Sequence, residues 1–132
     1  MDILFWLHSS VRWLVVLVAL IAAIKFAAGW ARRAHAEKVD RALMSAFSGL
    51  IDLQVALGVV YLLVQGIFSL QRIEHTVTMF VVAIVAHLPL RWRTRTDTNV
   101  LRNNLIVVIA VILLIIAGIA SLPGSRWFLR GL

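Results

Sequence analysis

The chain has 132 residues, of which 62% are hydrophobic and only 14% are charged, whereas a soluble domain is ~45–50% apolar. This composition argues against an ordinary water-soluble domain, and the formal charge of +7 lies mostly between apolar segments, where membrane orientation explains it better than nucleic-acid binding does. The sequence has no cysteine, which excludes disulfides, thiolate metal sites and covalent c-type haem attachment.

Four segments meet or approach the ~20 mostly apolar residues that a membrane helix needs. They lie at about residues 3–30, 42–68, 73–90 and 105–122. Because short connections force consecutive helices to run antiparallel, we expect one all-α domain over residues 1–132. The expected fold is an integral membrane four-helix bundle with up-down-up-down order, in which the first and third helices run in the same direction and face each other diagonally.

The first three spans carry ionisable residues, and the fourth carries none. The first span contains His8 and Arg12, the second has Asp52 near its middle, and the third begins near His75 and ends near His87. Ionisable groups within a membrane are costly and are therefore candidates for function. The fourth span is uncharged up to the Pro-Gly pair at positions 123–124, and we expect it to contribute packing.

Basic residues gather in two of the three connections. They are Arg32, Arg33, Lys38 and Arg41 after the first span, and Arg91, Arg93, Arg95 and Arg102 after the third. The other side has only Arg72, with Arg126 and Arg130 in the tail. The positive-inside rule therefore predicts that both termini lie on the non-cytoplasmic side. Tryptophans at positions 6, 30, 92 and 127 fall near span ends, as interfacial aromatic residues do.

His8 and His75 are the leading candidate ligands. Both lie near the outer ends of parallel helices, so the predicted bundle places them at similar depth. Two neutral imidazoles that face inward from diagonal helices can hold both axial positions of a b-type haem. The alternative is that both are interfacial side chains that bond to lipid headgroups.

Arg12 and Asp52 are the next candidates. Arg12 follows His8 by four residues, so it shares its helix face and lies about 6 Å deeper, where it can neutralise a haem propionate or an acidic partner. A buried, unpaired Asp52 carboxylate would be costly. Its expected partner is Arg12, with Lys25 as second choice and protonation of Asp52 as third.

His87 lies off the seam that His75 occupies. It is twelve residues further on, which places it about 120° around the helix and about 18 Å deeper. A second haem bound in the same way is thus disfavoured. We expect His87 to bond to a neighbouring helix, with contact to a partner subunit or a quinone head as alternatives. Met44 and Met79 are candidate thioether ligands, although flexible Met usually fills gaps in a core.

Four blocks of sequence carry a family resemblance. They are Leu7-His8-Ser9-Ser10-Val11-Arg12-Trp13, then Asp52-Leu53-Gln54 followed by Leu57-Gly58 and Tyr61, then Glu74-His75 with Met79 downstream, and lastly His87. Together these blocks resemble a group of short prokaryotic four-helix membrane proteins labelled cytochrome b-like. The resemblance covers the first three helices. It implies a prokaryotic inner (cytoplasmic) membrane and haem b, with His8 and His75 as ligands and Arg12 and Glu74 beside them.

Two functions are consistent with these observations. The first is a small b-type membrane cytochrome with one haem near the outer face, which transfers electrons with quinone or a larger redox complex as partner. The second is a cofactor-free accessory subunit of a larger respiratory or photosynthetic membrane complex. In both, the surroundings are a lipid bilayer, with other membrane subunits or further copies of the chain as neighbours. No nucleophile with its base and no paired carboxylates are present, which favours electron transfer over a stand-alone enzyme.

Overall fold

The computed structural model describes residues 3–66 and 69–120. Its elements are α1 (Ile3–Ala31), α2 (Lys38–Gln65), α3 (Leu70–Ala86), the short 3₁₀-helix η1 (Leu88–Trp92) and α4 (Thr98–Ala120). The described part of the chain contains no strand, which confirms the predicted all-helical class. Four helical segments are long and apolar enough to cross a membrane.

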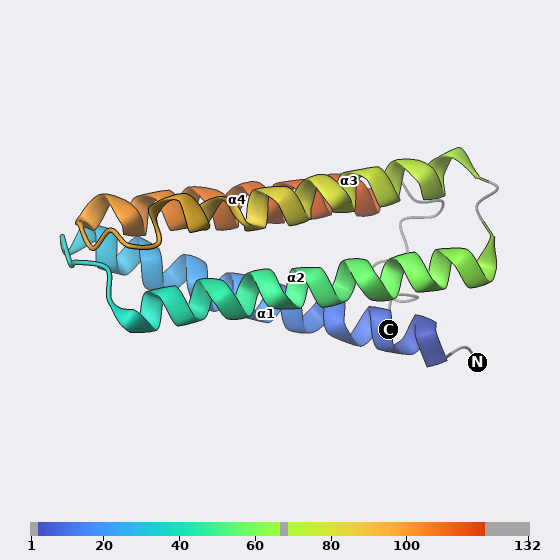
Figure 1. Cartoon of the computed structure of the whole chain (residues 1–132), viewed down its shortest axis with the longest axis horizontal. Coiled ribbons are helices and arrows are strands. Elements are labelled where there is room, and N and C mark those ends of the chain that lie inside the picture. Colours follow the sequence, from blue (N-terminus) through green and yellow to red (C-terminus); the bar gives the residue numbers. More distant parts are fainter. Residues whose placement is uncertain (1–2, 67–68, 121–132) are drawn as a thin grey trace.

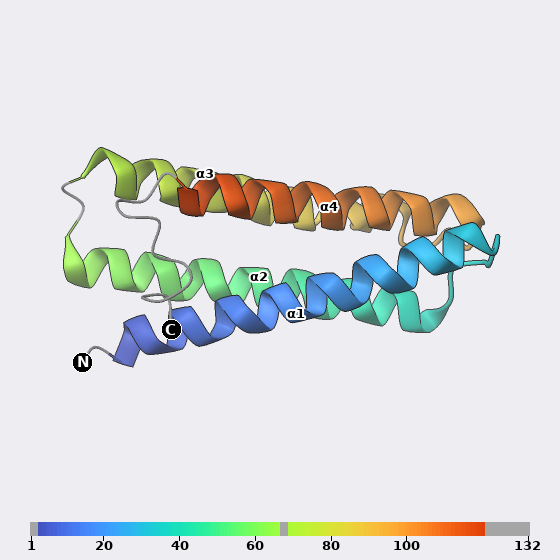
Figure 2. The ribbon, with the colours of Figure 1, turned by 180° about the vertical axis from the view of Figure 1, so that it is seen from behind.

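The helices lie lengthwise beside one another (Figures 1 and 2). Both α1 and α3 pack against α2 and α4, so α1 and α3 occupy opposite corners of the bundle. The connections α1–α2 and α3–α4 lie at one end, whereas α2 ends and α3 begins at the other (Figure 1). We call the end that holds the two basic connections the basic end. His8 and His75 belong to the opposite end of the bundle.

Three helices begin earlier than the predicted spans because polar residues extend them. α2 begins at Lys38 rather than near residue 42, α3 begins at Leu70 rather than near 73, and α4 begins at Thr98 rather than at 105. The hydropathy pattern locates only the apolar part of a helix and misses its polar first turns. In α4 these turns include Asn104, which is buried in the bundle. The expected ends of the second and fourth spans, together with Trp127, Arg126 and Arg130, lie outside the described residues.

The third span is interrupted near its end. α3 stops at Ala86, and the chain continues as η1 with Pro89 in its first turn. Proline has no backbone N–H and clashes with the preceding turn of an α-helix, so the α-helix cannot continue through Pro89. The predicted span 73–90 thus combines an α-helix with part of a tighter 3₁₀ turn.

The apolar core fills the middle of the bundle and its basic end. Its most buried members are Val15, Ala19, Ala22, Phe26, Phe47, Ile51, Val82, Val108 and Val111. Many large apolar side chains point outward instead, among them Leu17, Ile24, Leu63 and Ile84. Towards the start of α1 the interior becomes polar, because Ser9 and Gln54 are buried there.

Two hydrogen bonds join the basic connections, one between backbone groups and one from a side chain to the backbone. The Ala36 N–H donates to the Thr96 carbonyl over 2.9 Å, and the Thr98 hydroxyl donates to the Arg33 carbonyl over 3.2 Å. Close by, Lys25 of α1 forms an ion pair with Asp40, whose carboxylate also accepts the Glu37 N–H at the start of α2 over 2.7 Å. The basic end is thus held together by backbone bonds as well as by packing.

Candidate functional site

His8 and His75 lie in one polar cluster inside the bundle. The His8 ring packs on the backbone of Gly58 in α2, since a Cβ built on that glycine would lie 3.1 Å from Cε1 of the ring. His75 bonds to Gly118 of α4. The two histidines interact electrostatically with each other, and each interacts with Arg12. We call His8, Arg12, Gln54 and His75 the histidine cluster; all four helices build or support it.

The hydrogen bond of His75 selects the tautomer that carries its proton on Nδ1. Its Nδ1 lies 3.0 Å from the Gly118 carbonyl oxygen, which can only accept, so Nδ1 carries the proton. In the neutral ring Nε2 then keeps its lone pair. Metal-binding histidines characteristically donate their other ring N–H to a carbonyl or carboxylate. The ring of His75 is therefore held in the form that a metal ligand requires.

The contact between His8 and Gln54 leaves polar atoms unsatisfied. Their Nε2 atoms lie 3.5 Å apart, while Nδ1 of His8 and Oε1 of Gln54 are buried without a hydrogen-bond partner among the described residues. Turning the amide would let Oε1 accept from Nε2–H, but Nδ1 would still have no partner. Leaving such a group unpaired costs about 1–3 kcal/mol. Unpaired buried groups of this kind suggest a binding site.

The donor set of the cluster suits a porphyrin iron better than a bare metal ion. Within the described residues no three His, Asp or Glu side chains gather around one point. A porphyrin already supplies four nitrogen ligands to its iron, so only axial ligands are needed from the protein. Two histidines with available nitrogens therefore match haem in ligand type and number.

Arg12 does not pair with Asp52, so the expected ion pair is wrong. Asp52 bonds instead to His87, with 3.1 Å between Oδ2 and Nε2, and Lys25, the second choice, pairs with Asp40. The reason is the rotation of α2. The Asp52 side chain is 53% exposed on the lateral face towards α3, whereas Gln54, two residues on, points inward to His8.

Asp52 and His87 form a polar pair between α2 and the end of α3. Nδ1 of His87 donates to the Ala83 carbonyl over 2.8 Å, so Nε2 faces the carboxylate. The prediction that His87 bonds to a neighbouring helix is confirmed.

The other predicted candidates lie around the histidine cluster or away from it. Met79 packs on Gly118, where an added Cβ would lie 2.6 Å from the Met79 methyl group. Glu74 is exposed, and its backbone carbonyl accepts a hydrogen bond from the Thr78 hydroxyl over 2.8 Å. Met44 lies in the core near the basic end, so it is not a ligand in the cluster. Gln54 was not a predicted site residue, although an amide within an apolar span is a recognisable signal.

Comparisons of the chain with protein-family models, with curated proteins and with solved structures find no match. The fold and the cluster define a class: a four-helix bundle, apolar enough to cross a membrane, with a two-histidine polar cluster inside one end.

Proposed function

We propose that this chain is an integral membrane protein that crosses the inner membrane of a prokaryote four times in up-down-up-down order. Three observations support this proposal: the four long apolar helices, the outward-facing large apolar side chains, and the two basic connections at one end (Figure 1). By the positive-inside rule the basic end lies in the cytoplasm. Both termini and the histidine cluster then lie towards the opposite face.

Within this bundle we propose a small b-type cytochrome that binds one haem between His8 and His75. The observation that carries the proposal is that His8 and His75, on diagonal helices, belong to one polar cluster, in which Nδ1 of His8 is buried without a partner among the described residues. When bound, a haem supplies a reversible one-electron iron couple. The label of the resembled family points the same way.

The residues of the cluster have distinct roles in this proposal. The Gly118 carbonyl orients His75, and the absence of a side chain at Gly58 leaves room for the His8 ring. Gln54 lies beside the His8 ring and restricts its rotation. The half-buried Arg12 guanidinium offers a positive charge to a propionate. Trp13 lies below that charge, 5.7 Å from ring centroid to Cζ, which adds a cation–π contribution.

Electron exchange is proposed to take place at the outer face. A single haem near one end of the bundle does not connect the two membrane surfaces, so a partner must approach from the same side. A quinone or a larger redox complex fits this requirement. The protein then acts as an electron carrier rather than as a stand-alone enzyme.

A reduced-minus-oxidised absorbance spectrum of protein purified from a haem-replete host tests the proposal. We expect a b-type signal in the parent protein and its loss in His8→Ala and in His75→Ala. His87→Ala is the matched control, because it removes an imidazole from α3 without touching the cluster, and it should retain the signal. A parent protein without haem absorbance would refute the assignment.

A second function, a cofactor-free accessory subunit, is favoured by one observation. Asp52 and His87 form a polar pair that is 53% and 40% exposed on the lateral face, where a membrane would surround them with hydrocarbon unless another subunit covers them. Native electrophoresis of solubilised membranes separates the two functions. An accessory subunit migrates within a larger assembly that is lost on deletion of the chain, and it carries no haem.

A further inference from the structure

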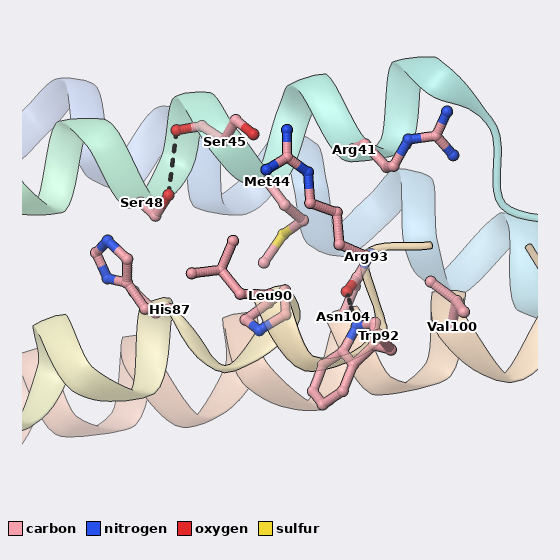
Figure 3. Close-up of a pocket in the computed structure, with 12 residues that line it drawn as sticks. Arg41, Met44, Ser45, Ser48, His87, Leu90, Trp92, Arg93, Val100 and Asn104 are labelled. Carbon is pink, nitrogen blue, oxygen red and sulfur yellow. Dashed lines mark hydrogen bonds between the residues drawn. The ribbon is translucent and has the colours of Figure 1, made fainter. Parts of the chain in front are cut away.

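A hollow opens between α2 and the segment formed by α3 and η1, near the basic end (Figure 3). Its volume is about 50 Å³, several times the ~10–15 Å³ that one water molecule needs. The hollow therefore has room for a small polar group. It is separate from the histidine cluster, which lies at the opposite end of the bundle.

The charged residues that line the hollow are basic. Arg41 on α2 and Arg93 after η1 both contribute, and the lining includes no carboxylate among the described residues. Figure 3 shows the Arg93 side chain reaching across towards α2, beside Met44. Neither guanidinium has an acidic partner within the described part of the chain, in contrast to Arg95, which pairs with Asp97. The hollow thus carries an uncompensated positive charge that favours an anion.

The position of Arg93 is set by the packing of η1. The indole N–H of Trp92 donates to the Asn104 side chain of α4 over 2.8 Å, and this bond holds the end of η1 against the bundle. Arg93 is the next residue, so its backbone is fixed at the edge of the hollow. A guanidinium held in this way loses less freedom on binding an anion than one on a free loop does.

The rest of the lining is mixed, with the polar side chains of Ser45, Ser48, His87 and Asn104 beside apolar ones. The apolar part includes Met44, Ala86 and Leu90, and Leu90 is exposed to the outside of the bundle. An anion bound here would thus sit next to an apolar surface that faces outward. An anionic phospholipid has this combination, a charged phosphodiester joined to acyl chains.

We propose that this hollow binds the phosphodiester headgroup of an anionic phospholipid, with Arg41 and Arg93 as its charged contacts and the acyl chains lying along α2 and α3. The site rests on the membrane part of the proposed function and is independent of haem. Basic pockets between membrane helices on the cytoplasmic side are known to hold such headgroups. The basic end is the cytoplasmic end in the proposed orientation, where such lipids would be available to it.

Native mass spectrometry of the delipidated full-length protein in an uncharged detergent tests the proposal. The probes are phosphatidylglycerol, phosphatidylcholine and glycerol phosphate. Phosphatidylglycerol should bind at least tenfold more tightly than phosphatidylcholine, whose headgroup is neutral overall. Glycerol phosphate has the charge but no acyl chains, and it should bind at least tenfold more weakly than phosphatidylglycerol. Equal binding of the two lipids, or equal binding of glycerol phosphate, would overturn the lipid site.

A matched pair of double variants localises the binding. A juxtamembrane basic residue contributes about fivefold in lipid affinity, so the variant Arg41→Gln with Arg93→Gln should weaken phosphatidylglycerol binding about 25-fold. The control, Arg32→Gln with Arg33→Gln, removes the same charge from the same end outside the hollow and should change binding less than threefold. Equal losses in both variants would show diffuse surface charge and refute the site.

Folding and the haem proposal are followed separately in the same samples. Circular dichroism should show unchanged helix content in both double variants, and the haem spectrum should be retained. Cell fractionation reports residence in the membrane. A parent protein that stays in the membrane but shows no lipid selectivity overturns this site alone. A parent protein that has lipid selectivity but no haem overturns only the cytochrome proposal.

Discussion

The contact between His8 and Gly58 gives a sharp test of the cluster's geometry. In Gly58→Ala the new Cβ would lie 3.1 Å from Cε1 of the His8 ring and 3.6 Å from Nδ1. The ring or the helix must then shift by a few tenths of an ångström. Overpacking of this kind typically costs about 1–3 kcal/mol.

Gly49→Ala is the matched control on the same helix. A Cβ at Gly49 meets nothing within 4 Å, so this variant reports only the helix preference for Ala over Gly, about 0.5–1 kcal/mol in favour of Ala. Gly58→Ala gains the same preference and loses the packing. We therefore expect its free energy of unfolding to lie about 1–3 kcal/mol below that of Gly49→Ala.

Reversible unfolding in mixed detergent micelles measures both variants. Repeating the pair in a His8→Ala background completes a double-mutant cycle. Without the imidazole ring, Gly58→Ala and Gly49→Ala should change the stability alike. If Gly58→Ala is as stable as Gly49→Ala while His8 is present, or if the difference between them persists after His8 is removed, the ring does not pack on Gly58 and the described cluster is wrong.

Three further predictions concern the polar pairs. Lys25→Met leaves the buried Asp40 carboxylate without its cation. We expect the free energy of unfolding, followed by thermal denaturation, to fall by about 1–3 kcal/mol, which is below the ~3–5 kcal/mol of a fully buried pair because the lysine is half exposed. An unchanged unfolding midpoint would contradict this. The Arg95 hydrogen bond lowers the pKa of Asp97. The contribution of this pair to the stability of the folded state is therefore present above the ordinary carboxyl pKa of ~3.9 and is lost as the pH falls through the lower pKa of the folded state. In Arg95→Gln, NMR titration should show that the pKa of Asp97 rises back towards its ordinary value. Asp52→Asn replaces the carboxylate that lies 3.1 Å from Nε2 of His87. The ¹⁵N NMR signal of Nε2 should then shift relative to the parent protein, whereas that of Nδ1, which bonds to the Ala83 carbonyl, should change little.

The sequence predicts position along a helix better than rotation about its axis. Helices that face lipid on one side and a core on the other are apolar almost all round, so the periodicity that reveals the inner face of a soluble helix is weak. The depth of Asp52 in α2 was therefore predictable, but its direction towards His87 was not. The same loss of pattern explains why Arg12 was expected to pair with it.

The partners of a side chain come from other helices, and the sequence alone does not identify them. The matched depth of His8 and His75 follows from four short-connected helices, and the structure brings the two rings into one cluster. The Gly118 carbonyl that orients His75, and the Gly58 backbone behind His8, depend on how α4 and α2 are turned. Glycines contribute no side chain to a motif, so their role emerges only from packing.

The hydrogen bonds between the basic connections have an effect at the far end of the bundle. They fix the height of the hairpin α1–α2 relative to the hairpin α3–α4. A helix transmits an axial shift along its length, at ~1.5 Å for each residue. An axial displacement at the bond between Ala36 and Thr96 would thus be carried along the helices to His8 and His75, although neither histidine lies in those loops. The hydrogen bonds between the two connections therefore help to set the alignment of both rings from the opposite end of the bundle.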